Sequence, residues 1–149
     1  MSMMRLKGEE YPEPGVAGII INEDNLVLLT QSQKWHDKFA LPGGHMRKGE
    51  SMFQSLQREM KEETNLDIVS GDLLCVEELM YPEEYYDSGR HFIIFIFRCR
   101  PKAYNQVRLN DEAYGYQWLP LADIDKFPLT EWSKKAIRRL NDPAIAHFE

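Results

Sequence analysis

The sequence predicts an α/β fold in which a mixed sheet is packed between helices, within one domain that spans residues 1–149. Three observations lead to this fold class. Apolar runs rich in β-branched and aromatic residues recur between clusters of turn residues, which is typical of strands. Two segments, one central and one near the C-terminus, combine helical periodicity with residues that favour helix starts. A length of 149 residues suits a single core, and the order strand, helix, strands, helix implies strands covered by helices.

The composition narrows the class of protein. A net charge of −6 argues against extensive contact with nucleic-acid backbones, which needs a basic surface, so no nucleic-acid polymer is expected as a partner. The two cysteines, Cys75 and Cys99, lie in apolar runs and are expected as buried thiols in a reducing compartment. The sequence shows no signal peptide and no apolar run of membrane length. We therefore expect a cytoplasmic protein without a membrane partner.

The N-terminal part predicts two strands. Residues 1–10 are polar and lack periodicity, so we expect a loose lead-in there. Residues 16–21 are apolar without interruption, which predicts a strand buried on both faces. Residues 26–30 predict a second strand, and the polar residues 22–25 between them predict a hairpin loop.

A polar loop at residues 31–40 follows and contains Trp35. Binding residues concentrate on loops, and an aromatic side chain beside a phosphate site can stack on a nucleobase. A tryptophan in such a place more often packs at the edge of a core, and that interpretation is favoured for Trp35. His36 and His45 are lone histidines in the sequence, so solvated or structurally bonded roles are favoured for both over catalysis.

The most informative segment is residues 43–66, which opens with a glycine pair and continues into a helix. Ser51 and Gln54 have the spacing of a capping box at the helix start. Asn65 suits the left-handed residue that ends a helix. Spacings of three and four place an apolar stripe toward the core, formed by Phe53, Leu56 and Met60.

The same helix carries three carboxylates, Glu59, Glu62 and Glu63. Residues three and four apart lie on one helix face, so Glu59 neighbours both of the others. Two like charges about 4 Å apart repel by roughly 4 kcal/mol at an effective dielectric of about 20. A hard divalent cation with oxygen ligands would turn this repulsion into attraction. The cluster therefore predicts a metal site.

Together these residues resemble the Nudix box, the signature of the Nudix hydrolases, which cleave nucleoside diphosphates linked to another moiety. The resemblance rests on Gly44, Glu50 and the run REMKEETNL at residues 58–66, preceded by LPGG at residues 41–44. Asn65 stands where the family usually has glycine. The resemblance implies the Nudix fold, an α/β/α sandwich with a mixed parallel and antiparallel sheet.

The resemblance also implies a magnesium-dependent hydrolase of phosphoanhydride bonds, with Mn²⁺ as a substitute. Glu50 and Arg58 are expected to pair and to orient the helix. Bound Mg²⁺ neutralises phosphate oxygens and lowers the pKa of a coordinated water. The implied metal ligands are Glu59, Glu62, Glu63 and the carbonyl of Gly44.

Two sources are open for the base that takes the proton from the attacking water. One is within the box, where Glu59 or Glu62 would serve. The other is Glu112, which lies six residues before Trp118, near where many family members carry an acid that reaches back to the metal site. A loop base suits an enzyme that closes over its substrate. Glu112 is favoured over the helix acids, with a solvated loop acid as the plain alternative.

The C-terminal half predicts three more strands and a helix, with candidate substrate residues between them. Strands are expected at residues 73–81, 92–99 and 114–119, and a helix capped by Thr130 is expected through residue 140. In the loop at residues 82–90, Tyr85 and Tyr86 are candidates for stacking on a base. For Arg90 and His91 a surface role is favoured over a contact with phosphate. The candidate substrate-binding residues are Trp35, Arg47 and Tyr85.

The expected substrate is a nucleoside triphosphate, cleaved to the monophosphate and pyrophosphate. The chain is short and lacks the additional N-terminal strand domain that is common in ADP-ribose hydrolases of the family. ADP-ribose and nucleotide sugars are the alternative substrates, and a homodimer is left open. A nucleotide sensor without activity is the alternative from another class, although such proteins usually lose acids of the box. An acidic calcium-buffering surface is disfavoured because no EF-hand loop is present.

Overall fold

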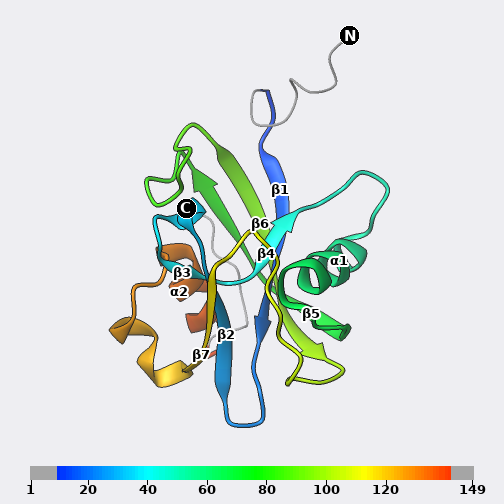
Figure 1. Cartoon of the computed structure of the whole chain (residues 1–149). Coiled ribbons are helices and arrows are strands. Elements are labelled where there is room, and N and C mark those ends of the chain that lie inside the picture. Colours follow the sequence, from blue (N-terminus) through cyan, green and yellow to red (C-terminus); the bar gives the residue numbers. More distant parts are fainter. Residues whose placement is uncertain (1–9, 142–149) are drawn as a thin grey trace.

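The computed structural model describes residues 10–141, so the loose lead-in expected at residues 1–10 lies outside the described residues except for its last residue. Two sheets are present (Figure 1). The four-stranded sheet has the order β4-β1-β6-β5, with β4 at Gly43–His45, β1 at Glu13–Ile20, β6 at His91–Pro101 and β5 at Ile68–Met80. The three-stranded sheet has the order β3-β2-β7, with β3 at Phe39–Ala40, β2 at Leu26–Gln31 and β7 at Gly115–Pro120.

The larger sheet is mixed, as expected for this fold class. β1 runs parallel to β6 and antiparallel to β4, while β5 and β6 form a long antiparallel pair. The expected single sheet is instead two sheets, because β1 and β2 separate after their turn. They share one bridge, between Ile21 and Val27, and β2 then pairs with β7. The hairpin predicted at residues 22–25 is therefore correct as a turn and wrong as a paired hairpin.

Two short strands and one strand start differ from the sequence-based expectations. β3 and β4 were not predicted, because two or three residues are too few to establish a period of two. β5 begins at Ile68, five residues before the expected start at residue 73. Register shifts interrupt its pairing with β6 between Ile68 and Ser70 and again between Leu73 and Cys75, which disturbs the alternation of buried and exposed residues.

Helices cover both faces of the larger sheet (Figure 1). α1 spans Met52–Thr64, α2 spans Glu131–Arg138, and short 3-10 turns occupy Gln33–Trp35 (η2) and Leu121–Lys126 (η3). Alternate residues of β1 enter two cores, which confirms a strand buried on both faces. On the α1 side the core contains Val16, Ile20, Leu56 and Met60, and on the α2 side it contains Ala17, Ile19, Trp132 and Ala136.

Both ends of α1 are as predicted. Ser51 Oγ accepts a hydrogen bond from the Gln54 N–H at 3.1 Å, and Gln54 Oε1 accepts one from the Ser51 N–H at 2.9 Å. Asn65 ends the helix in the left-handed region, with φ of 66°. α1 is thus a well-terminated helix that packs its apolar stripe on the sheet, with Glu59 and Glu63 along the edge of that stripe.

Thr130 is the N-cap residue of α2, as predicted, but its side chain makes a different contact. The Thr130 hydroxyl does not cap the helix and instead donates a hydrogen bond to Ser133 Oγ at 2.7 Å. The carboxylate of Glu84, in the loop at residues 82–90, accepts the Glu131 N–H at 2.9 Å. This places a negative charge at the helix N-terminus, where the backbone dipole favours it. The loop is thereby attached to α2.

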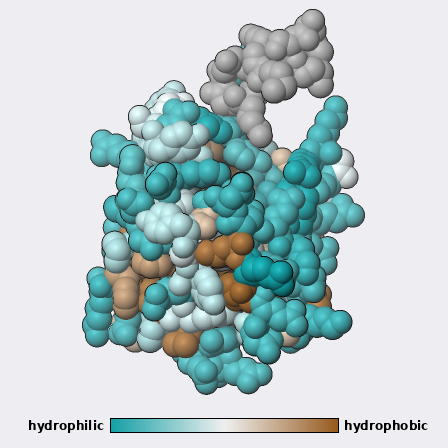
Figure 2. All heavy atoms as spheres, viewed as in Figure 1, coloured by the Kyte–Doolittle hydropathy of each residue, from teal (hydrophilic) through white to brown (hydrophobic). Residues whose placement is uncertain are grey.

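The surface and the cysteines agree with the composition. Hydrophilic residues dominate the face shown in Figure 2, with a small hydrophobic patch near its middle. Cys75 and Cys99 are both buried free thiols, as expected. Within residues 10–141, the helices are too short or too polar to cross a membrane.

Candidate active site

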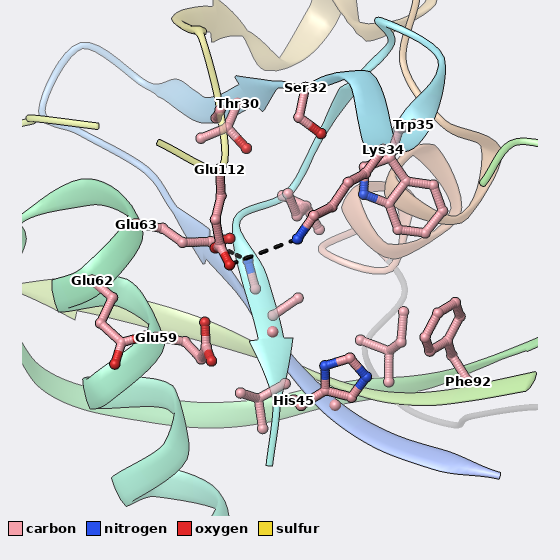
Figure 3. Close-up of a pocket in the computed structure, with 18 of the residues that line it drawn as sticks. Thr30, Ser32, Lys34, Trp35, His45, Glu59, Glu62, Glu63, Phe92 and Glu112 are labelled. Carbon is pink, nitrogen blue, oxygen red and sulfur yellow. Dashed lines mark hydrogen bonds and ion pairs between the residues drawn. The ribbon is translucent and has the colours of Figure 1, made fainter. Parts of the chain in front are cut away.

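One pocket of about 310 Å³ collects most of the residues singled out in the sequence. It lies between α1, the β1–β4 pair, η2 and the start of β6 (Figure 3). Its two ends differ in chemistry. Carboxylates line the end formed by α1, and aromatic rings line the end formed by η2, β6 and α2.

At the carboxylate end, Glu59 and Glu63 of α1 meet Glu112 from the loop before β7. Each offers one oxygen, and these oxygens all lie within 4.8 Å of one another. Figure 3 shows Glu112 reaching over Glu63 from the opposite side of the pocket. The structure therefore places the loop acid expected from its spacing to Trp118 directly beside the helix acids.

The electrostatics of this cluster are unfavourable without a cation. Glu63 is partly open to the pocket but surrounded by protein atoms, and this desolvation raises its pKa well above the usual range. The charges of Glu59 and Glu112 and a hydrogen bond with Glu112 raise it further. The Gly43 N–H, which donates to Glu63 Oε2 at 2.6 Å, opposes the rise in part. Hard oxygen ligands of this kind suit Mg²⁺ or Mn²⁺.

Glu62 lies beside this cluster and not within it. Its side chain is 44% exposed, and its carboxylate pairs with Arg58 at 3.4 Å and with Arg47 at 3.9 Å. Helix geometry explains the difference. Relative to Glu59, a residue four positions later is rotated by about 40° and a residue three positions later by about 60° in the opposite direction. The compact cluster is thus Glu59, Glu63 and Glu112, with Glu62 at the rim of the same pocket.

Gly44 is required by close packing against Glu59. A Cβ atom at Gly44 would overlap the Glu59 carboxylate, so any other residue would displace this acid. Gly44 pairs with Val16 of β1 and lines the pocket. The glycine of the box therefore has a structural reason in this chain.

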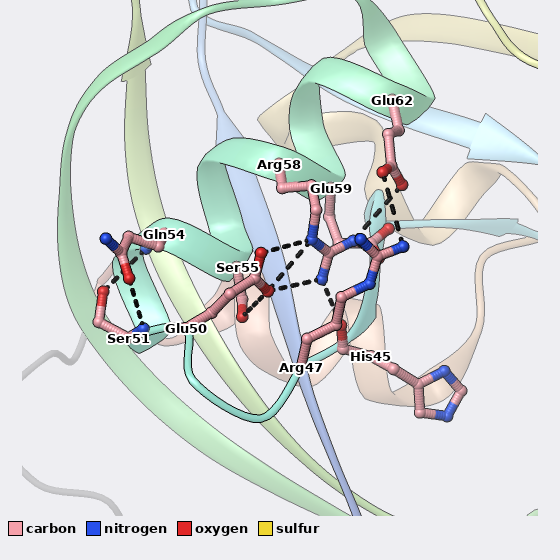
Figure 4. Close-up of polar contacts among 9 residues, drawn as sticks. All are labelled: His45, Arg47, Glu50, Ser51, Gln54, Ser55, Arg58, Glu59 and Glu62. Atoms are coloured by element: carbon pink, nitrogen blue, oxygen red, sulfur yellow. Dashed lines mark hydrogen bonds and ion pairs between the residues drawn. The ribbon is translucent and has the colours of Figure 1, made fainter.

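The predicted pair of Glu50 and Arg58 is confirmed (Figure 4). Arg58 donates to Glu50 Oε2 at 2.8 Å through Nε, to Glu59 Oε1 at 2.7 Å through Nη1 and to the His45 carbonyl at 2.9 Å through Nη2. The hydrogen bonds from Arg58 lower the pKa of Glu50 to about 2. Arg58 therefore attaches the loop that follows β4 to α1 and holds Glu59 in place.

The aromatic end is built around Trp35. Its ring centroid lies 4.6 Å from that of Tyr85 and 5.6 Å from that of Trp132. Trp35 packs against the core, as favoured, and it also lines the pocket. Stacking of Trp35 on a base stays a prediction. Tyr85 is only 7% exposed and lines the pocket, whereas Tyr86 is 58% exposed. Arg47 lines the pocket as well, so all three candidate substrate-binding residues meet there.

Sequence reasoning missed several residues of the pocket. Lys34 Nζ lies 3.6 Å from Glu112 Oε1, between the two ends (Figure 3). Its position directly before Trp35 was an available signal. Others needed the fold, since they come from β2 and the residue after it, from β6 and from α2: Thr30, Ser32, Phe92, Ile94 and Trp132.

The favoured surface role for Arg90 is wrong. Its side chain is 19% exposed and pairs with Glu13, a buried residue of β1 that the sequence did not single out. His91 pairs with Glu78 at 2.9 Å on the exposed side of β5 and β6. His45 is structurally bonded, as favoured, because its Nε2 lies 2.8 Å from Glu13 Oε1.

Comparisons with known proteins agree with this geometry. The family model of the NUDIX domain matches residues 12–140. The 8-oxo-dGDP phosphatase NUDT18 of Homo sapiens is 35% identical over 88 residues, which is 58% of this chain and 24% of that protein, so the chain spans about a quarter of that relative. The 8-oxo-dGTP diphosphatase of Buchnera aphidicola subsp. Schizaphis graminum is 27% identical over 115 residues, covering 75% of this chain and 80% of that protein.

Solved structures show the same architecture. The MutT protein of Methanosarcina mazei Go1 has a TM-score of 0.75 and 25% identity, over 89% of this chain and 96% of that one. The NUDIX domain of Shewanella oneidensis NrtR, solved with ADP ribose, has a TM-score of 0.74 and 20% identity, over 89% and 88% of the two chains. With the box, the sheet order and the carboxylate cluster in agreement with the family match, the chain belongs to the Nudix hydrolase family.

Proposed function

We propose that this protein hydrolyses a phosphoanhydride bond of a nucleoside triphosphate, with Mg²⁺ or Mn²⁺, to give the monophosphate and pyrophosphate. The observation that carries the proposal is a pocket with two chemically different ends. Carboxylates of Glu59, Glu63 and Glu112 converge at one end, and aromatic rings line the other. A nucleotide has the same polarity, because its polyphosphate needs cations and its base needs a flat apolar surface.

The residues present fit a divalent cation. Glu59 and Glu63 would hold it, together with the Gly44 carbonyl, and Glu62 at the rim would hold a further ion. Bound Mg²⁺ would supply positive charge to the phosphate oxygens and lower the pKa of a water that attacks phosphorus. Burial is the main cause of the raised pKa of both Glu63 and Glu59, and the charges of neighbouring carboxylates raise both further. A cation bound there would offset both effects.

The remaining polar residues have separate roles. Arg58, held by Glu50, fixes the position of Glu59. Arg47 and Lys34 line the pocket and would bind phosphate oxygens. Glu112 would accept the proton of the attacking water as the bridging P–O bond breaks and pyrophosphate leaves, with Glu59 or Glu62 as the alternative base.

The relatives support the substrate class. The Buchnera relative is named for its action on 8-oxo-dGTP, and this chain covers 80% of it. The two buried free thiols also fit the reducing cytoplasm as its location.

A substrate panel tests the proposal. dGTP, 8-oxo-dGTP and ADP-ribose are each incubated with the protein and Mg²⁺, and the products are identified by mass spectrometry. We expect deoxynucleoside monophosphate and pyrophosphate from a triphosphate, and no turnover in excess chelator. Glu63→Gln serves as the matched variant and should lose roughly 10²-fold in kcat with the fold retained. Full turnover in chelator, or cleavage of ADP-ribose alone, would contradict the proposal.

A further inference from the structure

Glu13, the first residue of β1, is a buried acid outside the carboxylate cluster. It is 2% exposed and accepts hydrogen bonds from two basic residues on other elements. Arg90, at the end of the loop at residues 82–90, donates to it through Nε at 2.6 Å and also through Nη2, and His45 Nε2 of β4 lies 2.8 Å away. A buried charge is costly unless it is well paired, so this arrangement calls for a reason beyond stability.

Arg90 connects Glu13 to the aromatic end of the pocket. Its guanidinium carbon lies 5.9 Å from the ring centroid of Tyr85 and 5.4 Å from that of Phe92, both within the range of cation–π attraction. The two rings contact each other edge to face, with centroids 4.9 Å apart. Both rings line the pocket. Arg90 therefore contacts both rings of this pair while it is bonded to Glu13.

Other contacts hold the outer part of the same loop. The Tyr86 N–H donates to the Lys34 carbonyl at 2.7 Å, next to Trp35. The Glu84 carboxylate bonds to Lys38 Nζ at 2.9 Å as well as to the start of α2. These contacts attach the loop to η2 and α2, while Arg90 attaches its last residue to β1. The aromatic wall is thus held from both sides.

We propose that Glu13 and Arg90 are positioning residues that keep Tyr85 and Phe92 in place to bind a planar base, and that they set base affinity without acting in the chemical step. Neither residue belongs to the carboxylate cluster, and both act through the rings that they hold. The identity of the planar group as a nucleobase rests on the proposed function. The positioning role itself rests on the contacts of Glu13 and Arg90.

Binding of guanosine, which has a base but no phosphate, tests the role without metal or turnover. Trp35 and Trp132 line the pocket, so tryptophan fluorescence reports occupancy. We expect saturable quenching in the native protein and about tenfold weaker binding in Arg90→Met and in Glu13→Gln. Because the pair acts as a unit, the double variant should bind no more weakly than either single variant. Glu78→Gln is the matched control, since Glu78 also pairs with a basic residue of the same hairpin, outside the pocket.

Kinetics with dGTP separate the two ends of the pocket. Arg90→Met should raise KM by about tenfold, with kcat and the inhibition constant of tripolyphosphate within about twofold of native. Should Arg90→Met fail to fold, Arg90→Lys replaces it, with an expected threefold or so weaker guanosine affinity because the paired donors are lost. Guanosine binding that is absent in the native protein or unchanged in the folded variants would overturn the inference, as would an equal loss of tripolyphosphate inhibition. If guanosine binding shifts as expected but dGTP is not cleaved, the proposed function fails and the positioning role stands.

Discussion

Glu13 and Glu59 are two buried glutamates with opposite electrostatics. They are 2% and 7% exposed, and each accepts a hydrogen bond from an arginine. Burial raises the pKa of both, yet the hydrogen bonds from Arg90 and His45 outweigh burial at Glu13 and lower its pKa. At Glu59 burial prevails over Arg58, and the pKa is raised.

The two sites also differ in how many acids share each base. Glu13 has Arg90 and His45 for one carboxylate, although Arg90 also lies 3.5 Å from Asp87. At the other site Arg58 pairs with three carboxylates, those of Glu50, Glu59 and Glu62. Two further carboxylates, those of Glu63 and Glu112, lie beside Glu59. A buried acid with its own basic partners is part of the framework, whereas a surplus of acids marks a place for an external cation. Four predictions test this contrast.

The largest effect is expected in the carboxylate cluster, at Glu112. Glu112→Gln should reduce kcat by roughly 10² to 10⁴ with KM little changed, because it removes the proposed base and leaves the helix ligands. Steady-state kinetics and a metal titration measure this. Asp111→Asn, the adjacent acid on the same loop, is the control and should retain activity. An unaltered kcat in Glu112→Gln would return the role of base to Glu59 or Glu62.

On the paired side, Glu13→Gln should lower the free energy of unfolding by about 3 kcal/mol, since it leaves the partly buried charge of Arg90 without its main partner. Urea denaturation at neutral pH measures this change. The exposed pair of Glu78 and His91 offers a control, because Glu78→Gln should change stability by less than about 0.5 kcal/mol. If Glu13→Gln is as stable as the native protein, Glu13 does not stabilise the fold and the contrast with Glu59 fails.

The opposite sign is expected at Glu59. Without metal, Glu59→Gln should leave the unfolding free energy unchanged or raise it, because one of several repelling charges is removed. With millimolar Mg²⁺ the native protein should gain roughly 1 to 3 kcal/mol, since the ion binds only the folded cluster, and Glu59→Gln should lose most of this gain. Thermal melts with Mg²⁺ and with chelator measure both. If the native protein melts at the same temperature with Mg²⁺ as with chelator, the cluster does not bind a cation.

The smallest expected effect is a difference in how the unfolding free energies of the two variants depend on pH below neutrality. Because folding lowers the pKa of Glu13, its contribution is complete above the ordinary value of 4.5 and is lost as the pH falls through the lowered pKa. Folding raises the pKa of Glu59 in the metal-free protein, so protonation there favours the folded state as the pH falls toward 4.5. The difference in unfolding free energy between the native protein and Glu13→Gln should therefore shrink below pH 4.5. The corresponding difference between the native protein and Glu59→Gln should not shrink below that pH. Urea titrations across this range distinguish the two.

Much of the site was predictable because it is encoded locally. Ser51 and Gln54 bond to each other at the start of α1, and the Asn65 N–H bonds to the Lys61 carbonyl at its end, so each end depends on residues three or four positions apart. The same helical period predicted the stripe toward the core. The periodicity also placed several acids on one face, although it did not show which of them would converge.

What only the tertiary structure decided depends on contacts between distant segments. Glu112 joins the helix acids across some fifty residues of chain, and Arg90 reaches Glu13 across 77. β1 and β2 are joined by a tight turn but enter different sheets: they share one bridge, whereas β2 pairs with β7 along its whole length. Hydrophobic periodicity identifies buried faces but carries no information on which distant side chain will share a pocket. The sequence by itself determined the family, the helix and its acids, while the fold decided which acids pair with bases and which gather in a cluster.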